Sequence, residues 1–283
     1  NEESYATFIS FFGLDNRFLS NDKITLDPFF DNYSASAEQP KTVKSPFKNL
    51  KNFQYKCFSD CQELLHPPLS RAILQMPTGS GKTRTASEVI ADHLNENGIR
   101  QVVWLANTRE LCEQAIQCMS EVWDHIGRRT CRFNRLWDGN FNNFKSWKEN
   151  ECVFSVMSLQ SGWSTITRKI DKFTEDFAKT SLIIVDEAHI AIAPTYKTVI
   201  ENLVSLSHCK VLGLTATPGR TIEEETSSLS DLFNYNITAL SDPNKKRDNA
   251  IAYLRSINVM SIAHHSDLIY EHSFIISKKD TTN

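Results

Sequence analysis

This sequence is poor in the residues that mark fibrous, flexible or membrane-spanning chains. It holds nine glycines and nine prolines among 283 residues, about half the combined share of roughly 12% in average proteins. That scarcity excludes collagen-like, linker-like and low-complexity chains. No apolar run approaches the roughly 18 residues that a membrane-spanning helix needs, and no signal-peptide pattern opens the chain. We therefore expect a soluble globular protein with no membrane partner.

An excess of charge of one sign is also missing. The 31 basic and 34 acidic residues give a formal net charge of −3, so any nucleic-acid-binding surface must be local. The seven cysteines are an odd number and form no set of Cys and His at zinc-ligand spacing. Reduced, buried thiols are the better interpretation, and they favour a cytoplasmic protein or, more broadly, an intracellular one, the nucleus included.

The chain divides into three parts. Residues 1–46 join a Phe-rich stretch to a polar, proline-containing linker, and we expect a small N-terminal appendage. Residues 47–240 form the main domain, and residues 241–283 lead out of it. The chain begins with Asn rather than Met, so we expect either a processed chain or a piece of a longer protein.

Within the main domain, short apolar runs alternate with longer amphipathic ones. After a first helix that begins near Phe47 and ends before Pro67, the expected strands are 72–76, 102–106, 153–157, 182–185 and 211–214. The helices between them are expected at 82–95, 108–123, about 165–178 and 195–206, with a weaker strand at 232–240 and a helix at 245–256. Strands that are apolar throughout, alternating with helices, predict an α/β fold: a mostly parallel sheet covered by helices on both faces.

The strongest local signal is a glycine-rich turn between a predicted strand and a predicted helix, Met-Pro-Thr-Gly-Ser-Gly-Lys-Thr at 76–83. Its glycines let successive N–H groups turn inward around phosphate oxygens, and the following helix adds its positive N-terminus. Lys82 would reach the β- and γ-phosphates, and the Thr83 hydroxyl would ligate Mg²⁺. Met76 departs from the general GxxxxGK[ST] pattern, and a chance glycine-rich turn is the alternative. The pattern predicts a Walker A loop that binds ATP with Mg²⁺ through Pro77, Thr78, Gly79, Ser80, Gly81, Lys82 and Thr83.

A second signal is a pair of adjacent carboxylates, Asp186 and Glu187, at the end of a predicted buried strand. Ligands of open α/β sheets bind at the carboxyl ends of the strands. Asp186 would hold Mg²⁺, directly or through water, and Glu187 would orient and deprotonate the water that attacks the γ-phosphate. An ordinary strand-to-helix turn with acidic caps is the alternative.

Three segments in this order resemble motifs I, II and III of superfamily 2 helicases: residues 77–83, Asp-Glu-Ala-His at 186–189 and Thr-Ala-Thr at 215–217. Residues 108–114 look like motif Ia, although Asn107 stands where the family often has proline before it. The run Leu-Gly-Leu-Thr-Ala-Thr-Pro-Gly-Arg at 212–220 most resembles the branch of type I restriction motor subunits and related DNA translocases. The resemblance covers about residues 47–220, and at most extends to 256.

The resemblance implies a RecA-like lobe of a P-loop NTPase, with ATP at one edge of the sheet and a nucleic-acid strand across its top. Gln54 is placed like the glutamine of the family that reads adenine. His189, Thr215 and Thr217 would couple the nucleotide site to the nucleic acid. A helix-start histidine and helix N-capping threonines are the alternatives.

Four polar residues follow predicted strands where the family holds nucleic acid. Thr108 and Arg109 could bind backbone phosphates through a helix N-terminus and a guanidinium, without reading base sequence. Ser158 and Gln160 could do the same from the next strand. A surface charge on a first helical turn is the alternative for Arg109, and plain polar loop residues are the alternative for the other pair.

A basic stretch with one tryptophan interrupts the main domain. Its members are Arg128, Arg129, Arg132, Arg135 and Trp137. These side chains could contact phosphates, but a solvated strand face is the better interpretation.

The function expected from all this is the ATP-binding motor lobe of an ATP-dependent DNA helicase or translocase, whose second RecA-like lobe lies outside this chain. An RNA helicase or RNA sensor, or a regulatory ATP-binding module without motor activity, is the alternative. No QxxGRxxR segment, which would supply an arginine finger, follows Arg220. The isolated chain should therefore bind ATP with Mg²⁺ and hydrolyse it weakly.

Overall fold

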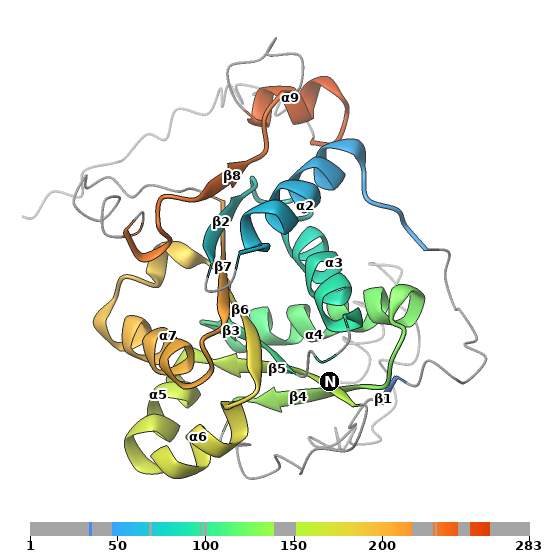
Figure 1. Ribbon diagram of the computed structural model, residues 1–283. Coiled ribbons are helices and arrows are strands. Elements are labelled where there is room, and N and C mark those ends of the chain that lie inside the picture. Colours follow the sequence, from blue (N-terminus) through green and yellow to red (C-terminus); the bar gives the residue numbers. More distant parts are fainter. Residues whose placement is uncertain are drawn as a thin grey trace, which may run out of the picture.

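The protein, seen here in a computed structural model, is built on one eight-stranded sheet (Figure 1). The structure describes residues 34–35, 47–67, 70–96, 98, 101–138, 151–216, 229, 231–242 and 250–260. The strand order is β1-β4-β5-β3-β6-β7-β2-β8. Every neighbouring pair is parallel except β1 with β4. The predicted mostly parallel α/β fold is confirmed.

The strands are short, and the central ones are buried. They are β1 Ser34–Ala35, β2 Arg71–Gln75, β3 Gln101–Ala106, β4 Cys131–Leu136, β5 Cys152–Ser158, β6 Thr180–Val185, β7 Lys210–Thr215 and β8 Ile237–Ala239. All six residues of β3 are buried, as expected for a parallel strand with helices on both sides. The five strands predicted from apolar runs are confirmed to within two residues at each end.

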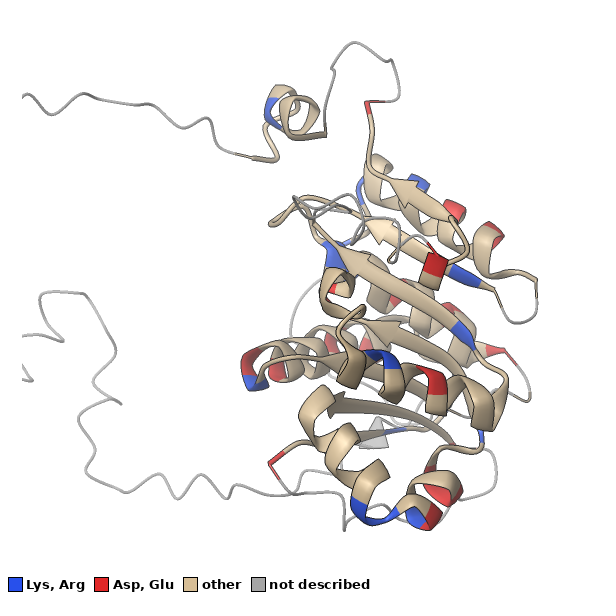
Figure 2. Ribbon diagram, turned by 90° about the vertical axis from the view of Figure 1, so that its left-hand side faces the viewer, with Lys and Arg blue, Asp and Glu red and all other residues tan. Residues whose placement is uncertain are grey.

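Helices cover both faces of the sheet, as predicted (Figure 1). One face carries α2 Asn52–Leu65, α3 Lys82–Asn95 and α4 Arg109–Ile126, and the other carries α5 Leu159–Arg168, α6 Ile170–Phe177 and α7 Pro194–Ser207. Successive residues of β6 alternate between the two cores: Leu182 and Ile184 pack with the first set of helices, Ile183 and Val185 with the second. The strands are mostly free of charged residues, which lie mainly on the helices and near strand ends (Figure 2).

The chain after β8 remains in contact with this domain. In α9, Ala250–Ser256, Leu254 is fully buried and joins the core of the α2–α4 face. Part of the predicted 241–283 segment therefore packs on the domain, and the division of the chain at residue 240 stays a prediction. None of the helices in the described ranges is long and apolar enough to cross a membrane.

Several predicted boundaries were wrong. The first helix begins at Asn52 rather than near Phe47. The single helix expected at 165–178 is two helices: Ser158 caps α5 by accepting from the N–H of Ser161, and Lys169, with φ −147°, separates α5 from α6.

Three predicted segments at the ends of the chain also need correction. In the stretch expected as a strand over 232–240, only Ile237–Ala239 is extended; residues 231–232 are helical and residues 233–235 form a turn. The helix expected at 245–256 is described from Ala250 onward. Within the predicted linker, Ser34 and Ala35 form β1 and pair with Arg132 and Cys131 of β4; the rest of residues 1–46 lies outside the described part of the chain.

The solvated basic face predicted for residues 128–137 was wrong for Arg132 and Trp137, whereas Arg128 is exposed and Arg129 and Arg135 are partly exposed. Arg132, in β4, and Trp137, the residue after β4, are each only 4% exposed. Arg132 Nε donates to Glu151 Oε1 at 3.2 Å, and its Nη2 bonds to Glu151 Oε2. Both faces of β4 are covered, with Phe133 in one core and Leu136 in the other, so the buried arginine requires this carboxylate partner.

Candidate nucleotide and nucleic-acid site

The predicted nucleotide-binding residues follow three strands that lie next to one another. The phosphate loop follows β2, Thr215 ends β7, and Asp186 and Glu187 follow β6; the sheet order places β6, β7 and β2 side by side. Since all three strands are parallel, their carboxyl ends meet at one edge. The topology therefore brings distant segments of the sequence into a single site.

The phosphate loop is a compact turn that leads directly into α3. Pro77 O accepts from both the N–H and the hydroxyl of Ser80, at 3.1 and 2.6 Å. Gly81, the N-cap of α3, has φ 90°, a backbone conformation that side chains with a Cβ rarely adopt. The first N–H groups of α3 have no intrahelical acceptors, as at any helix N-terminus, and with the helix dipole they suit a phosphate group.

Gln54 fastens α2 to this loop. The side chain is 9% exposed; its Nε2 donates to Ser80 O at 3.0 Å, and its Oε1 accepts from Lys51 N at 2.9 Å. A Cβ on Gly81 would lie 2.2 Å from Gln54 Nε2, so this approach requires glycine. The amide that the resemblance assigns to adenine thus contacts the phosphate loop, and its reading of the base stays a prediction.

The predicted catalytic side chains contact one another. Lys82 Nζ lies 3.2 Å from Glu187 Oε1, and His189 Nδ1 lies 3.3 Å from Glu187 Oε2. Glu187 has φ 48° and ψ 53°, a left-handed conformation that is uncommon for a residue other than glycine and that occurs often at functional sites. The backbone therefore aims this carboxylate toward the lysine of the phosphate loop.

Asp186 is a buried carboxylate, 4% exposed. Glu187 N donates to its Oδ1 at 3.0 Å. Burial raises the pKa of the Asp186 carboxyl, and the nearby Lys82 ammonium, the Glu187 N–H and the Trp104 indole oppose that rise. Because burial disfavours the charged form of this carboxyl group, a cation bound beside it would be favourable. With the Thr83 hydroxyl in the first turn of α3, it is an oxygen donor set of the kind that Mg²⁺ prefers.

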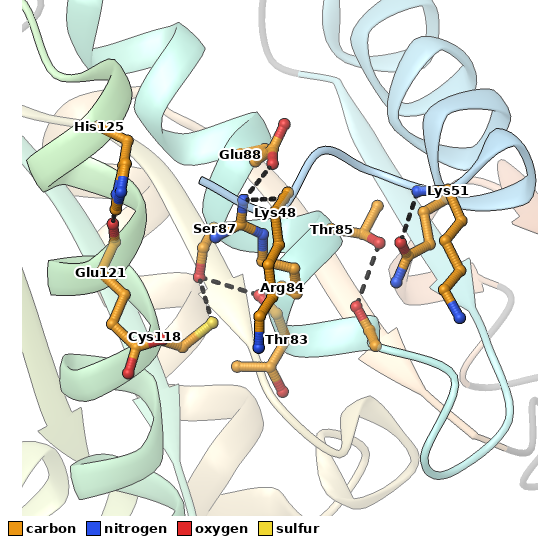
Figure 3. Close-up of polar contacts among 12 residues, drawn as sticks. Lys48, Lys51, Thr83, Arg84, Thr85, Ser87, Glu88, Cys118, Glu121 and His125 are labelled. Carbon is orange, nitrogen blue, oxygen red and sulfur yellow. Dashed lines mark hydrogen bonds and ion pairs between the residues drawn. The ribbon is translucent and has the colours of Figure 1, made fainter. Parts of the chain in front are cut away.

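A second set of contacts at the loop was missed by the sequence reasoning (Figure 3). Arg84, the residue after Thr83, donates through Nη2 to Lys48 O and to Glu88 Oε1, both at 2.8 Å. Its guanidinium carbon also lies 4.9 Å from the centre of the Phe47 ring. These contacts hold the segment that enters α2 against α3. An aromatic residue ahead of Gln54 was the only signal available in the sequence.

Two predicted coupling residues have different outcomes. Thr215 is fully buried at the end of β7, and its carbonyl accepts from Met76 N, the first residue after β2, at 3.0 Å. The third motif thus adjoins the phosphate loop directly. Thr217 lies outside the described residues.

The four predicted nucleic-acid residues lie at neighbouring strand ends, because β3 and β5 are adjacent. Thr108 caps α4 by accepting from Leu111 N at 3.3 Å. Arg109 is exposed and lies 3.4 Å from the Asp138 carboxylate. The place of Arg109 on α4 fits its alternative, a first-turn surface charge, as well as a phosphate contact. The capping role of Thr108 was not predicted.

The second pair of these residues belongs to α5. Ser158 is the N-cap of α5, and Gln160 is exposed in its first turn. One contact at this edge had no signal in the sequence: Tyr196 of α7 donates its hydroxyl to Asn107 Oδ1 at 2.7 Å. It joins the helix after the acidic motif to the residue before Thr108.

A parallel sheet with a phosphate loop after one strand and an acidic pair after a near neighbour defines a RecA-like lobe of a P-loop NTPase. Solved structures share this fold. The Pyrococcus furiosus Hef helicase domain matches with a TM-score of 0.53 at 20% identity, over 70% of this chain and 39% of that one. A nuclease-deletion mutant of the type ISP restriction-modification enzyme LlaGI, in complex with a DNA substrate mimic, matches with a TM-score of 0.50 at 17% identity, over 74% of this chain and 22% of that one.

The family model described as "Type III restriction enzyme, res subunit" matches residues 47–220, and the chain belongs to this family. The resemblance to superfamily 2 helicases, inferred over the same residues, is confirmed.

Curated relatives are named as DNA helicases. The chain is 25% identical over 185 residues to the ATP-dependent DNA helicase MPH1 of Candida albicans, a match over 62% of this chain and 15% of that protein. It is 26% identical over 170 residues to the DEAD-box ATP-dependent DNA helicase Fancm of Drosophila melanogaster, over 58% of this chain and 11% of that protein. The chain thus spans less than a sixth of the length of either relative.

Proposed function

We propose that this chain is the ATP-binding motor lobe of an ATP-dependent DNA helicase or translocase, which couples ATP hydrolysis to movement along nucleic acid. The contact of Lys82 with Glu187, next to the buried Asp186, carries this proposal. It supports the proposal because an ammonium group and a carboxylate lie side by side at the end of the phosphate loop, as a phosphate-binding cation and a base for water activation would need to. The names of the relatives, all DNA helicases, favour DNA over RNA.

In this proposal each residue of the site has a separate task. The phosphate loop binds the triphosphate through its N–H groups, and Lys82 leaves Glu187 to bind the β- and γ-phosphates. Thr83 and Asp186 would ligate Mg²⁺, which neutralises phosphate charge when bound. Glu187, released from the lysine, accepts the proton of the attacking water.

Coupling would run from the nucleotide to the nucleic-acid residues. His189 contacts Glu187, and the carbonyl of Thr215 contacts Met76 at the start of the phosphate loop. A movement of Glu187 or of the loop when nucleotide binds would therefore shift both residues. Thr217 follows Thr215 in the same motif. Thr108, Arg109, Ser158 and Gln160 would hold backbone phosphates at the ends of β3 and β5. Because β3 pairs with β6, a shift of the acidic motif after β6 would be passed directly to the nucleic-acid residues that follow β3.

A second RecA-like lobe, supplied by the full-length protein, would complete the two-lobed motor. It would close on ATP and contribute an arginine finger, which is worth on the order of 10³–10⁵ in rate. An intracellular, cytoplasmic location fits the seven free cysteines.

Replacing Glu187 with Gln tests the catalytic assignment. The amide keeps the size of the side chain but cannot accept the proton, so we expect nucleotide binding within about twofold of the original chain and no detectable ATP hydrolysis. Lys82→Ala is the control that should lose binding itself. Hydrolysis that persists in Glu187→Gln would disprove the proposed role of the base.

The DNA assignment is tested separately, in ATPase assays of the chain with double-stranded DNA, single-stranded DNA or RNA. We expect DNA to stimulate and RNA to have little effect, with turnover far below that of two-lobed motors. Stimulation by RNA alone would favour the RNA helicase or sensor. ATP binding with no hydrolysis under any condition would favour a regulatory module.

A further inference from the structure

Trp104 is a fully buried tryptophan in the middle of β3, beside the nucleotide site. Its register partner on β6 is Ile184, and side chains two residues apart on a strand share a face. Asp186 therefore lies on the same face as Trp104, one step further toward the carboxyl edge. The backbone agrees, because Asp186 N donates to Leu105 O at 2.9 Å.

The indole nitrogen of Trp104 is an unexplained polar atom in this core. Within the described part of the chain, Nε1 is buried and makes no hydrogen bond of ordinary length and angle. A buried N–H without a partner destabilises the fold. The carboxylate that the indole does influence is Asp186, whose pKa it helps to lower.

Two other groups lie near Asp186, but neither is free to fix the orientation of its carboxylate. Glu187 N donates to Asp186 Oδ1 at 3.0 Å, but Glu187 has a positive φ and is itself the proposed catalytic base. Lys82 Nζ is engaged with Glu187 and, in the proposed function, moves to the phosphates. Trp104, by contrast, is held rigidly between β5 and β6 and packs edge-on against Phe154, with ring centres 6.4 Å apart.

We propose that Trp104 is a positioning residue for Asp186: its indole N–H, buried on the same face of the sheet and without a hydrogen-bond partner among the described residues, donates to the carboxylate when the metal ion binds and fixes the orientation in which Asp186 ligates that ion. This inference rests on the proposed function, in which Asp186 is a metal ligand. Groups that orient metal ligands from behind commonly change metal affinity on the order of 10- to 100-fold when they are removed.

The test is the Mg²⁺ dependence of nucleotide binding, measured with a fluorescent ATP analogue. Trp104→Phe removes the N–H, and we expect the half-saturating Mg²⁺ concentration to rise about tenfold, with metal-free nucleotide binding unchanged within about twofold. Trp123→Phe is the matched control: Trp123 is equally buried in the same core, and its Nε1 donates to Arg129 O at 3.2 Å, on α4 and away from the acidic motif. It should leave the Mg²⁺ dependence unchanged.

If Trp104→Phe does not fold, benzothienylalanine at position 104 keeps the shape of indole with sulfur in place of N–H, and should give the same tenfold shift. An unchanged Mg²⁺ dependence in the folded variant, or an equal shift in Trp123→Phe, would overturn the inference. Failure of the proposed function is distinguishable, because it is measured on the original chain, which would then bind no ATP, bind it without hydrolysis, or be stimulated by RNA alone. The inference depends instead on the difference in Mg²⁺ dependence between Trp104→Phe and Trp123→Phe.

Discussion

Replacing Gln54 with alanine should loosen the phosphate loop before any nucleotide binds. The substitution removes two hydrogen bonds, from Gln54 Nε2 to Ser80 O and from Lys51 N to Gln54 Oε1. The first joins segments 26 residues apart and is buried; the second closes the first turn of α2. Gln54→Ala therefore tests whether this side chain holds the loop in place as well as, in the proposed function, reading adenine.

The size of the effect follows from these two bonds. Each neutral hydrogen bond contributes about 0.5–1.5 kcal/mol, and Ser80, 3% exposed, keeps a carbonyl that water reaches poorly. We expect the free energy of unfolding to fall by about 2 kcal/mol, which lowers Tm by about 4–8 °C in a domain of this size. Gln54→Glu should lower the free energy of unfolding by at least as much, because its carboxylate can accept from Lys51 N but cannot donate to Ser80 O.

The assay is thermal and urea unfolding of the nucleotide-free chain. Gln117→Ala is the control, because Gln117 is an exposed residue of α4 whose amide donates to the exposed side chain of Glu121. It should change stability by less than about 0.5 kcal/mol. If Gln54→Ala unfolds like Gln117→Ala, the loop contact contributes nothing. If it also loses its preference for ATP over GTP, Gln54 acts only on the base.

Three further substitutions test other parts of the structure. Gly213→Ala places a Cβ 2.8 Å from Ala188 Cβ in the acidic motif, so we expect the free energy of unfolding in urea to fall by about 1–3 kcal/mol and ATP hydrolysis to decrease. Unchanged hydrolysis would show that the acidic motif tolerates displacement of Ala188. Arg132→Met leaves Glu151 buried without its partner and should cost about 3–5 kcal/mol, most of which Arg132→Met/Glu151→Leu should restore; a double variant no better than the single one would contradict this. Burial, assisted by a nearby lysine, lowers the pKa of His93 to about 4, against about 6.5 when unfolded. The unfolded chain therefore binds more protons between these values, so stability should be lost as pH falls from about 6.5 to 4, by up to about 3 kcal/mol, and His93→Asn should flatten that slope.

The phosphate loop could be predicted because its chemistry is contiguous. Glycines that turn N–H groups inward, the lysine and the threonine stand together in residues 76–83, so no tertiary information was needed to recognise them. The helix after the loop, predicted over 82–95, is observed as Lys82–Asn95. The same holds for Asp186 and Glu187, because a buried strand that ends in two carboxylates is a local pattern.

The basic stretch shows where that reasoning fails. Four arginines near one tryptophan indicated a solvated face, and only the place of β4 between β1 and β5 decided that Arg132 would be buried. Its partner, Glu151, lies 19 residues further along the chain. Periodicity describes a strand, but it does not say which strands will flank it.

By itself, then, the sequence determined the chemistry of the nucleotide site and the alternation of strands and helices, since both are written in neighbouring residues. Only the tertiary structure decided which groups come together: Gln54 with the phosphate loop, Lys82 with Glu187, and Trp104 on the same face of the sheet as Asp186. The physical reason is the strand order, β6-β7-β2, with β3 on the far side of β6. That order arises from packing of the whole sheet against two layers of helices, and no single segment contains it.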